Sequence, residues 1–207
     1  MNTGDTAFMI ISAALVFFMT PGLAFFYGGL VRRKNVCNTM MACVAIMGIS
    51  VVMWALFGYS LSFGGNHGGI IGDFRWLGLN GVGMEAGPYA DNIPHLVFCA
   101  FQMMFAMITP ALITGSLVGR MRFKALFLFV ALWSIIVYYP LAHMVWGEGG
   151  FLAAIGSVDF AGGDVVHISS GISAVVLAVI LGRRRGYEHT TYRIHNIPFV
   201  VLGASML

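Results

Sequence analysis

Five apolar runs, each long enough to cross a bilayer as a helix, dominate this sequence of 207 residues. About 20 apolar residues span the ~30 Å hydrocarbon core of a membrane, because each residue advances an α-helix by about 1.5 Å. Backbone polar groups find no water inside a bilayer, so such runs must satisfy their own hydrogen bonds as helices. The sequence therefore predicts an all-α integral membrane protein, a polytopic transmembrane helix bundle with five complete spans. The predicted spans are residues 7–31, 36–63, 94–118, 125–146 and 162–181.

Composition excludes an ordinary soluble domain. Hydrophobic residues make up 59% of the chain and charged residues 9%, whereas a soluble domain carries about 25% charged residues.

The first apolar run lacks a preceding basic residue and is too long for the hydrophobic region of a signal peptide. The last apolar run, 197–207, is too short to span a bilayer. We expect it to be the start of a sixth span in a longer chain.

The basic residues predict the orientation of the bundle. They follow the first, third and fifth runs, with Arg75 the one exception, and most acidic residues lie at the opposite ends. Short loops rich in Lys and Arg remain cytoplasmic. We therefore expect the N-terminus outside and residues 183–196 inside. The basic residues of these three links are Arg32, Arg33, Lys34, Arg120, Arg122, Lys124, Arg183, Arg184, Arg185 and Arg193. The acidic residues at or near the opposite ends are Asp5, Asp73, Glu85, Asp91, Glu148, Asp159 and Asp164.

Known soluble-enzyme motifs are absent from the sequence. It contains no phosphate-binding loop, dinucleotide fingerprint, zinc-protease helix or nucleophile elbow. Cys37, Cys43 and Cys99 lie in apolar runs without metal-ligand or disulfide spacing, so we interpret them as small hydrophobic residues. The sequence favours transport over catalysis. It predicts a protein that is not an enzyme, with no cofactor, no metal and no nucleic-acid partner.

Ionisable residues open the fifth run. Such a side chain within a spanning helix costs roughly 2.5–3.5 kcal/mol by insertion scales, so it faces a cavity or a partner. His167 lies about 8 Å into the span, at 1.5 Å per residue, and either lines a pore or bonds to a neighbouring helix. Asp164 lies one helical turn earlier, where it can share a face with His167; a helix-start anion is its favoured interpretation. Asp159 precedes the span, and either caps the helix or attracts a cation.

Aromatic residues mark the third and fourth runs. Phe98, Phe101 and Phe105 recur at helical spacing beside Gln102, and such a stripe is typical of helix packing. Trp146 ends the fourth run. It is either an interfacial tryptophan or a cation–π contact at a pore mouth, worth about 0.5–2 kcal/mol.

Four stretches together resemble a known family. They are Pro21–Asn35, Ala100–Ala106, Ala142–Gly147 and Asp159–His167, and they occur in this order. The sequence resembles the N-terminal half of ammonium transporters of the Amt/Mep/Rh family, closest to the prokaryotic Amt branch. The resemblance covers essentially the whole chain, which we interpret as the N-terminal part of one transporter domain.

The resemblance implies an architecture and a set of roles. The fold would be the first half of an eleven-span inverted repeat, assembled as a homotrimer with a pore in each subunit of a cell membrane. Trp146 resembles the tryptophan of an outer recruitment site, and Phe105 resembles a gate phenylalanine that Phe101 flanks. His167 resembles the first of two pore histidines. Asp159 resembles the aspartate that supports the recruitment site.

The resemblance also implies a function. Ammonium would be recruited at the outer aromatic site and deprotonated, and ammonia would then cross a hydrophobic pore past His167. The alternatives are an Amt-like ammonium sensor coupled to a signalling module, or a neutral gas channel of the Rh type, which Trp146 disfavours. The implied partners are ammonium or ammonia, the lipid bilayer and a PII-type signal protein on the cytoplasmic face.

Overall fold

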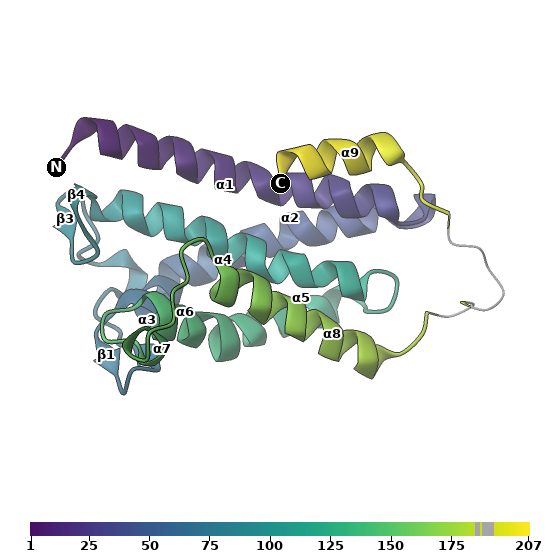
Figure 1. Cartoon of the computed structure of the whole chain (residues 1–207). Helices are drawn as coiled ribbons and strands as arrows, with labels where there is room; N and C mark the ends of the chain where they lie inside the picture. The colour runs from purple at the N-terminus through teal and green to yellow at the C-terminus, as the bar shows by residue number, and fades with distance from the viewer. Residues whose placement is uncertain (185–186, 188–192) are drawn as a thin grey trace.

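Five long apolar helical segments lie side by side in a computed structural model that describes residues 1–184, 187 and 193–207 (Figure 1). Each is long and apolar enough to cross a membrane. This confirms the predicted all-α bundle with five complete spans, and the chain is a multi-pass membrane protein. The five spans are Thr3–Leu30, Arg33–Phe63, His95–Leu117, Phe123–Ala154 and Gly163–Leu181.

Three of the five spans contain a short π-helical turn, in which the N–H groups bond to carbonyls five residues earlier. The uninterrupted spans are α1 (Thr3–Leu30) and α4 (His95–Leu117). The second span comprises η1 (Arg33–Asn35), α2 (Val36–Met53), the π turn η2 (Trp54–Gly58) and α3 (Tyr59–Phe63). The fourth comprises α5 (Phe123–Trp133), the π turn η4 (Ser134–Tyr138), α6 (Tyr139–Trp146) and the short α7 (Phe151–Ala154). The fifth comprises the π turn η5 (Gly163–Ile168) and α8 (Ser169–Leu181).

The π turn of the second span lies where this span touches the fourth. Gly58 ends η2, and a Cβ built on it would lie 2.7 Å from Cζ of Tyr139, the residue that follows η4. Only a glycine lets the Tyr139 ring approach this backbone, because a methyl group there would overlap the ring. The side of the second span is therefore shaped to receive the fourth.

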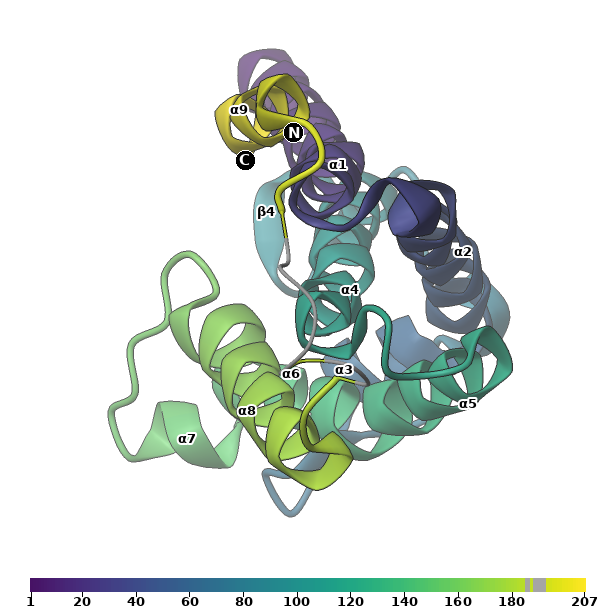
Figure 2. The same cartoon turned by 90° about the vertical axis from the view of Figure 1, so that its right-hand side faces the viewer.

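The two ends of the bundle differ in chemistry. Links from the first, third and fifth spans meet at one end, which Figure 2 shows facing the viewer, and these links carry the described basic residues apart from Arg75. Arg185 and Glu188 of the third such link lie outside the described residues. This arrangement is what the charge-based orientation requires, with the end shown in Figure 2 predicted to be cytoplasmic.

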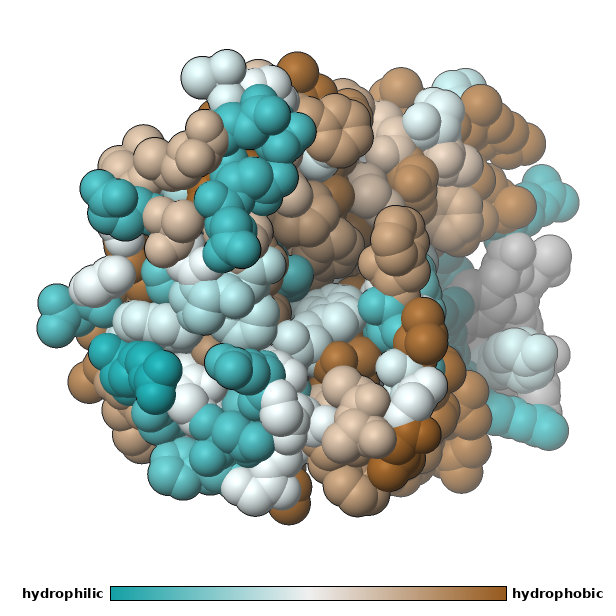
Figure 3. Space-filling view, turned by 60° about the vertical axis from the view of Figure 1, so that its left-hand side comes forward, coloured by the Kyte–Doolittle hydropathy of each residue, from teal (hydrophilic) through white to brown (hydrophobic). Residues whose placement is uncertain are grey.

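The opposite end carries an irregular cap, formed by the link between α3 and α4. It contains two short antiparallel strand pairs and a 3₁₀ turn, and Figure 3 shows hydrophilic surface over this end beside hydrophobic surface along the helices. The cap elements are β1 (Asn66–His67), β2 (Ile71–Gly72), η3 (Leu77–Leu79), β3 (Ala86–Gly87) and β4 (Ala90–Pro94).

A sixth helix, α9 (Ile197–Met206), packs against α1 and runs antiparallel to it (Figure 1). Asn196 caps it, because its side chain accepts a hydrogen bond from the Phe199 N–H at 3.1 Å. The two helices approach closely at Gly203, where an added Cβ would lie 2.3 Å from the backbone nitrogen of Phe26. Small residues allow such close approach of helices in a membrane.

We expect Gly203→Ala to weaken the packing of α9 on α1. The methyl group would overlap the α1 backbone, and overpacking of this kind costs about 1–3 kcal/mol. Thermal unfolding of the purified protein in detergent measures the effect. Gly48→Ala in α2 is the matched control, because no heavy atom lies within 4 Å of the Cβ it adds. A melting temperature that falls equally in both variants would contradict the contact.

Candidate functional site

Three aromatic side chains form a continuous line between the third and fourth spans. The rings of Phe101 and Phe105 on α4 meet edge-to-face, with centroids 5.0 Å apart and planes at 84°. Phe105 in turn contacts Trp146 at the end of α6, with centroids 6.1 Å apart. All three side chains are half-buried. The structure thus brings together three of the residues that the sequence singled out.

Asp159 lies next to this line. The Trp146 indole N–H donates to the Asp159 backbone carbonyl at 3.1 Å. This bond fixes the edge of the indole ring and leaves its faces for other contacts. The same residue therefore connects the outer end of the fourth span to the start of the fifth.

The Asp159 carboxylate caps the fifth span. Oδ1 accepts hydrogen bonds from the N–H groups of Gly162 and Gly163 at 2.6 and 2.8 Å. Oδ2 accepts from those of Asp164 and Val165, both at 2.9 Å. The first N–H groups of a helix have no partner within it, and a carboxylate there also meets the favourable end of the helix dipole. The sequence left two interpretations of Asp159 open, a helix cap and a group that attracts a cation. The carboxylate adopts the geometry of a helix cap.

A glycine makes this cap feasible. Gly162 has φ = +88°, in the left-handed region that side chains other than glycine rarely adopt. The chain turns there so that four successive N–H groups converge on one carboxylate. The Gly162-Gly163 pair was the signal for this turn in the sequence.

Asp164 and His167 do not share a face, and this part of the prediction was wrong. The segment Gly163–Ile168 is π-helical, so three residues correspond to a smaller rotation than in an α-helix. Asp164 lines a cavity of about 470 Å³ between the fourth and fifth spans, where it accepts a hydrogen bond from the Ser157 hydroxyl at 2.8 Å. His167 is not among the residues that line this cavity, and it is exposed. Asp164 retains its place in the first helical turn, as a helix-start anion requires.

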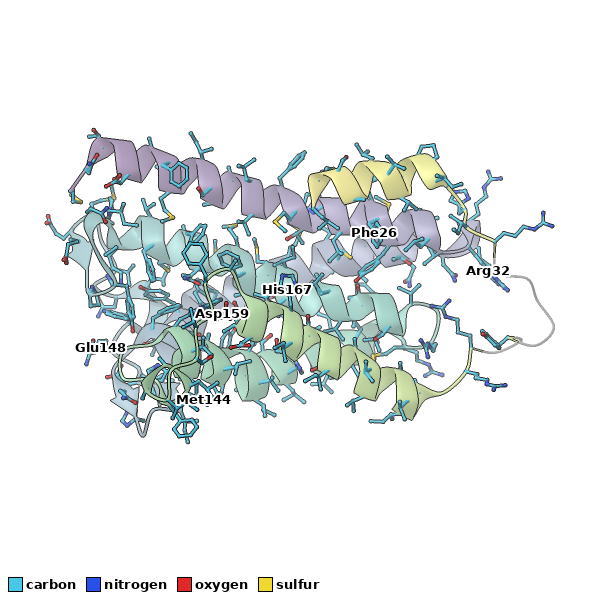
Figure 4. All side chains as sticks on the ribbon, in the orientation of Figure 1. Phe26, Arg32, Met144, Glu148, Asp159 and His167 are labelled. Atoms are coloured by element: carbon cyan, nitrogen blue, oxygen red, sulfur yellow. The ribbon has the colours of Figure 1, made fainter. Side chains whose placement is uncertain are left out.

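His167 lies on the segment that the Asp159 carboxylate fixes. Its backbone N–H donates to the Gly162 carbonyl at 3.0 Å, and η5 packs against α4, which carries Phe101 and Phe105. Figure 4 shows Asp159 and His167 near the start of the fifth span, with Arg32 at the far end of the bundle. The capped turn therefore sets both the depth and the direction of the histidine.

The cap also holds the outer end of the fourth span, which Asp159 contacts through Trp146. The Tyr89 hydroxyl donates to the Phe63 carbonyl at 2.8 Å and accepts from the Glu148 N–H at 3.1 Å. Burial raises the pKa of Tyr89. The hydroxyl therefore stays neutral, and it can both donate and accept a hydrogen bond. Buried His143, three residues before Trp146, bonds to the Ser62 carbonyl at 3.1 Å. The sequence analysis did not predict these contacts, and the aromatic and histidine residues of the two segments were the only signal for them.

Asp73 organises the neighbouring turn of the cap. Its Oδ1 accepts from the N–H groups of Gly65 and Arg75, both at 2.9 Å, and its Oδ2 lies 3.4 Å from Nε of Arg75. Desolvation raises the pKa of Asp73, but the two backbone hydrogen bonds and the Arg75 charge outweigh it. The net pKa of this carboxyl is below its ordinary value.

Comparison with known proteins places this arrangement in a family. The model of the Ammonium Transporter Family matches residues 7–207. The chain belongs to the ammonium transporter family. The resemblance inferred from the four sequence stretches is thereby confirmed.

Individual members of the family are similar over the whole chain. An ammonium transporter of Bacillus subtilis is 49% identical over 207 residues, which cover 100% of this chain and 50% of that protein. A putative ammonium transporter of Methanothermobacter thermautotrophicus is 48% identical over 209 residues, with 100% and 50% covered. The chain spans about half the length of the curated relatives it matches.

Solved structures agree with the fold. The crystal structure of Candida albicans Mep2 superposes with a TM-score of 0.87 at 31% identity, over 98% of this chain and 45% of that one. A structure described as a sensor Amt protein superposes with a TM-score of 0.86 at 28% identity, over 98% and 51% of the two chains.

We expect Asp159→Asn to destabilise the start of the fifth span by roughly 2–3 kcal/mol. An asparagine has one acceptor oxygen, so its NH₂ group would face two of the N–H donors and leave them unsatisfied. Thermal unfolding in detergent reports the loss. Asp164→Asn is the control, because an amide oxygen can still accept from Ser157. Equal melting temperatures for the two variants would show that the cap is unimportant.

The lowered pKa of Asp73 predicts an acid-sensitive cap. A depressed pKa in the folded protein adds stability that is complete above the ordinary value of 3.8 and is lost as the pH falls through the folded pKa. Below about pH 4, Asp73→Asn should therefore lose less thermal stability than the parent protein. Asp91→Asn, at an exposed position of the same link, should decline as the parent does. Parallel pH profiles for the parent and Asp73→Asn would refute the assignment.

Proposed function

We propose that the complete protein transports ammonium across a cell membrane, capturing the cation at Trp146 and passing ammonia by Phe105, which Phe101 flanks, towards His167. The observation that supports it most is the contact series from Trp146 through Phe105 to Phe101, beside a carboxylate-capped turn that carries His167. Membership of the ammonium transporter family adds independent support.

Capture of the cation needs an exposed aromatic face with a fixed orientation. Cation–π attraction contributes about 0.5–2 kcal/mol when a cation lies over a tryptophan ring. The indole edge of Trp146 is bonded to the Asp159 carbonyl, so the ring is held without using its faces. The side chain is half-buried, which lowers the competition from water for the bound ion.

Passage beyond Trp146 favours a neutral molecule. Stripping water from an ion in a low-dielectric path costs tens of kcal/mol by the idealised Born estimate. Ion-selective filters offset this cost with rings of carbonyl oxygens, whereas Phe101 and Phe105 present aromatic carbon. Transfer of one proton from ammonium to water at the outer mouth leaves ammonia and hydronium, and so removes the cost before this line. His167 then offers ammonia a hydrogen-bond donor and acceptor beyond it.

Sensing of ammonium is the second candidate function. The similarity to a sensor Amt protein favours it, since that likeness is as close in fold as the one to Mep2. A sensor needs the recruitment site but not a high flux. Uptake of labelled methylammonium by proteoliposomes, compared with protein-free liposomes, separates the two, because a sensor that binds without conducting gives no added uptake.

We expect Trp146→Leu to raise the ammonium concentration for half-maximal transport by about 2–30-fold, the equivalent of the cation–π energy. Trp146→Phe keeps an aromatic face but loses the bond to the Asp159 carbonyl. It should therefore raise this concentration less than Trp146→Leu does. Concentration dependence of uptake measures both variants. Identical curves for the parent and Trp146→Leu would leave Trp146 as an interfacial anchor only.

We expect His167→Ala to lower the ratio of ammonium to potassium uptake by about tenfold, since a positioned proton donor and acceptor is worth at least that in a transfer step. Uptake by proteoliposomes supplied with each cation alone gives the ratio. His67→Ala, in the exposed part of the cap, serves as the control and should leave the ratio unchanged. An unchanged ratio in His167→Ala would remove His167 from the mechanism.

A further inference from the structure

A cavity of about 490 Å³ opens at the basic end of the bundle. Six basic side chains line it, and no acidic residue is among the described residues that do. They come from all three basic links, two of them before α2, one between α4 and α5, and three after α8. We name this the basic cavity. Its basic residues are Arg32, Lys34, Arg120, Arg183, Arg184 and Arg193.

The basic cavity is more than a consequence of orientation in the membrane. Positive loops on the cytoplasmic side require only that the links carry Lys and Arg. Here the charges of three separate links converge on one space, while Arg33 and Arg122 of the same links do not line it. These two residues have the same charge at the same end of the molecule. Convergence is therefore a property of the fold.

Arg120 shows how one of these charges is held. Its Nη1 donates to the Gly182 carbonyl at 2.8 Å and to the Ala178 carbonyl at 3.4 Å. Carbonyls at a helix C-terminus have no partner within the helix, and a cation there meets the favourable end of its dipole. Arg120 thus joins the third link to the end of α8, and its guanidinium is fixed at the wall of the cavity. A fixed guanidinium loses little freedom when it binds a further group.

The lining selects the chemical class of ligand. Arginine presents a planar fork of N–H donors that matches the oxygens of a phosphate, and such charge-assisted bonds are about twice as strong as neutral ones. Apolar Leu30, Val31 and Leu181 also line the cavity and suit the organic part of a ligand. The volume is within the usual range of ligand sites, about 300–1,000 Å³.

We propose that the basic cavity binds the phosphate group of an anionic ligand, supplied either by a membrane lipid headgroup or by a soluble phosphate compound. Both sources share the chemistry that the arginines recognise. The site lies at the opposite end of the molecule from Trp146 and is independent of whether the protein conducts ammonium. Its occupation can therefore be measured without transport.

The test compares variants with equal changes in charge. Lys34→Gln and Arg193→Gln remove a charge from the basic cavity, while Arg33→Gln and Arg122→Gln remove one from the same links outside it. The complete protein, purified in detergent, is titrated with inorganic pyrophosphate by calorimetry. Native mass spectrometry then compares retention of phosphatidylglycerol with that of phosphatidylcholine. Thermal unfolding of all four variants confirms that they are folded.

The outcomes distinguish three explanations: binding of a soluble phosphate, binding of a lipid headgroup, and attraction by general charge. Pyrophosphate binding that weakens about tenfold or more in the two cavity variants but not in the controls assigns a soluble phosphate. Selective loss of phosphatidylglycerol in the cavity variants, without pyrophosphate binding, assigns a lipid headgroup. An equal loss in all four variants would show attraction by general charge and overturn the proposal. So would a parent protein that binds neither probe.

Discussion

The carboxylate of Asp159 is the contact on which the arrangement of the candidate site depends. It satisfies four backbone N–H groups at the start of the fifth span, and such groups are costly to leave unpaired at the edge of a bilayer. Its backbone carbonyl receives the Trp146 indole. One residue therefore sets the position of the recruitment candidate on one side and of His167 on the other. A shift in this turn would move both.

The cap has the complementary task of holding the fourth span from outside. Tyr89 connects the end of α3 to the residues after Trp146, and His143 connects α6 to Ser62. The bond between His143 and Ser62 is made by polar groups buried beneath the cap, where an unmade bond is expensive. Trp146 is thus held by the cap on one side and by Asp159 on the other. A rigid aromatic ring in this position discriminates between cations better than a mobile one, because its binding geometry is prepared in advance.

The sequence predicted the spans and the alternation of the links. Both depend on local features such as the length of an apolar run or the sign of a charge. It did not predict the π turns, because apolar runs such as Trp54–Gly58 read alike in α- and π-helices. The error over Asp164 and His167 follows directly, since their common face assumed α-helical geometry. The bonds of Tyr89 and His143 join residues far apart in the chain, and residue spacing alone does not specify such pairs.

The charge distribution also bears on which species crosses the bundle. Among the residues that the structure describes, the acidic ones lie at or near the end with Trp146 and Asp159, whereas the other end gathers basic side chains from three links around one cavity. An ammonium ion crossing towards that end would approach a positive potential, and like charges at short range repel strongly where water is scarce. Ammonia has no net charge and meets no such barrier. The same basic residues would therefore attract a phosphate and leave the proposed passage of a neutral molecule unopposed.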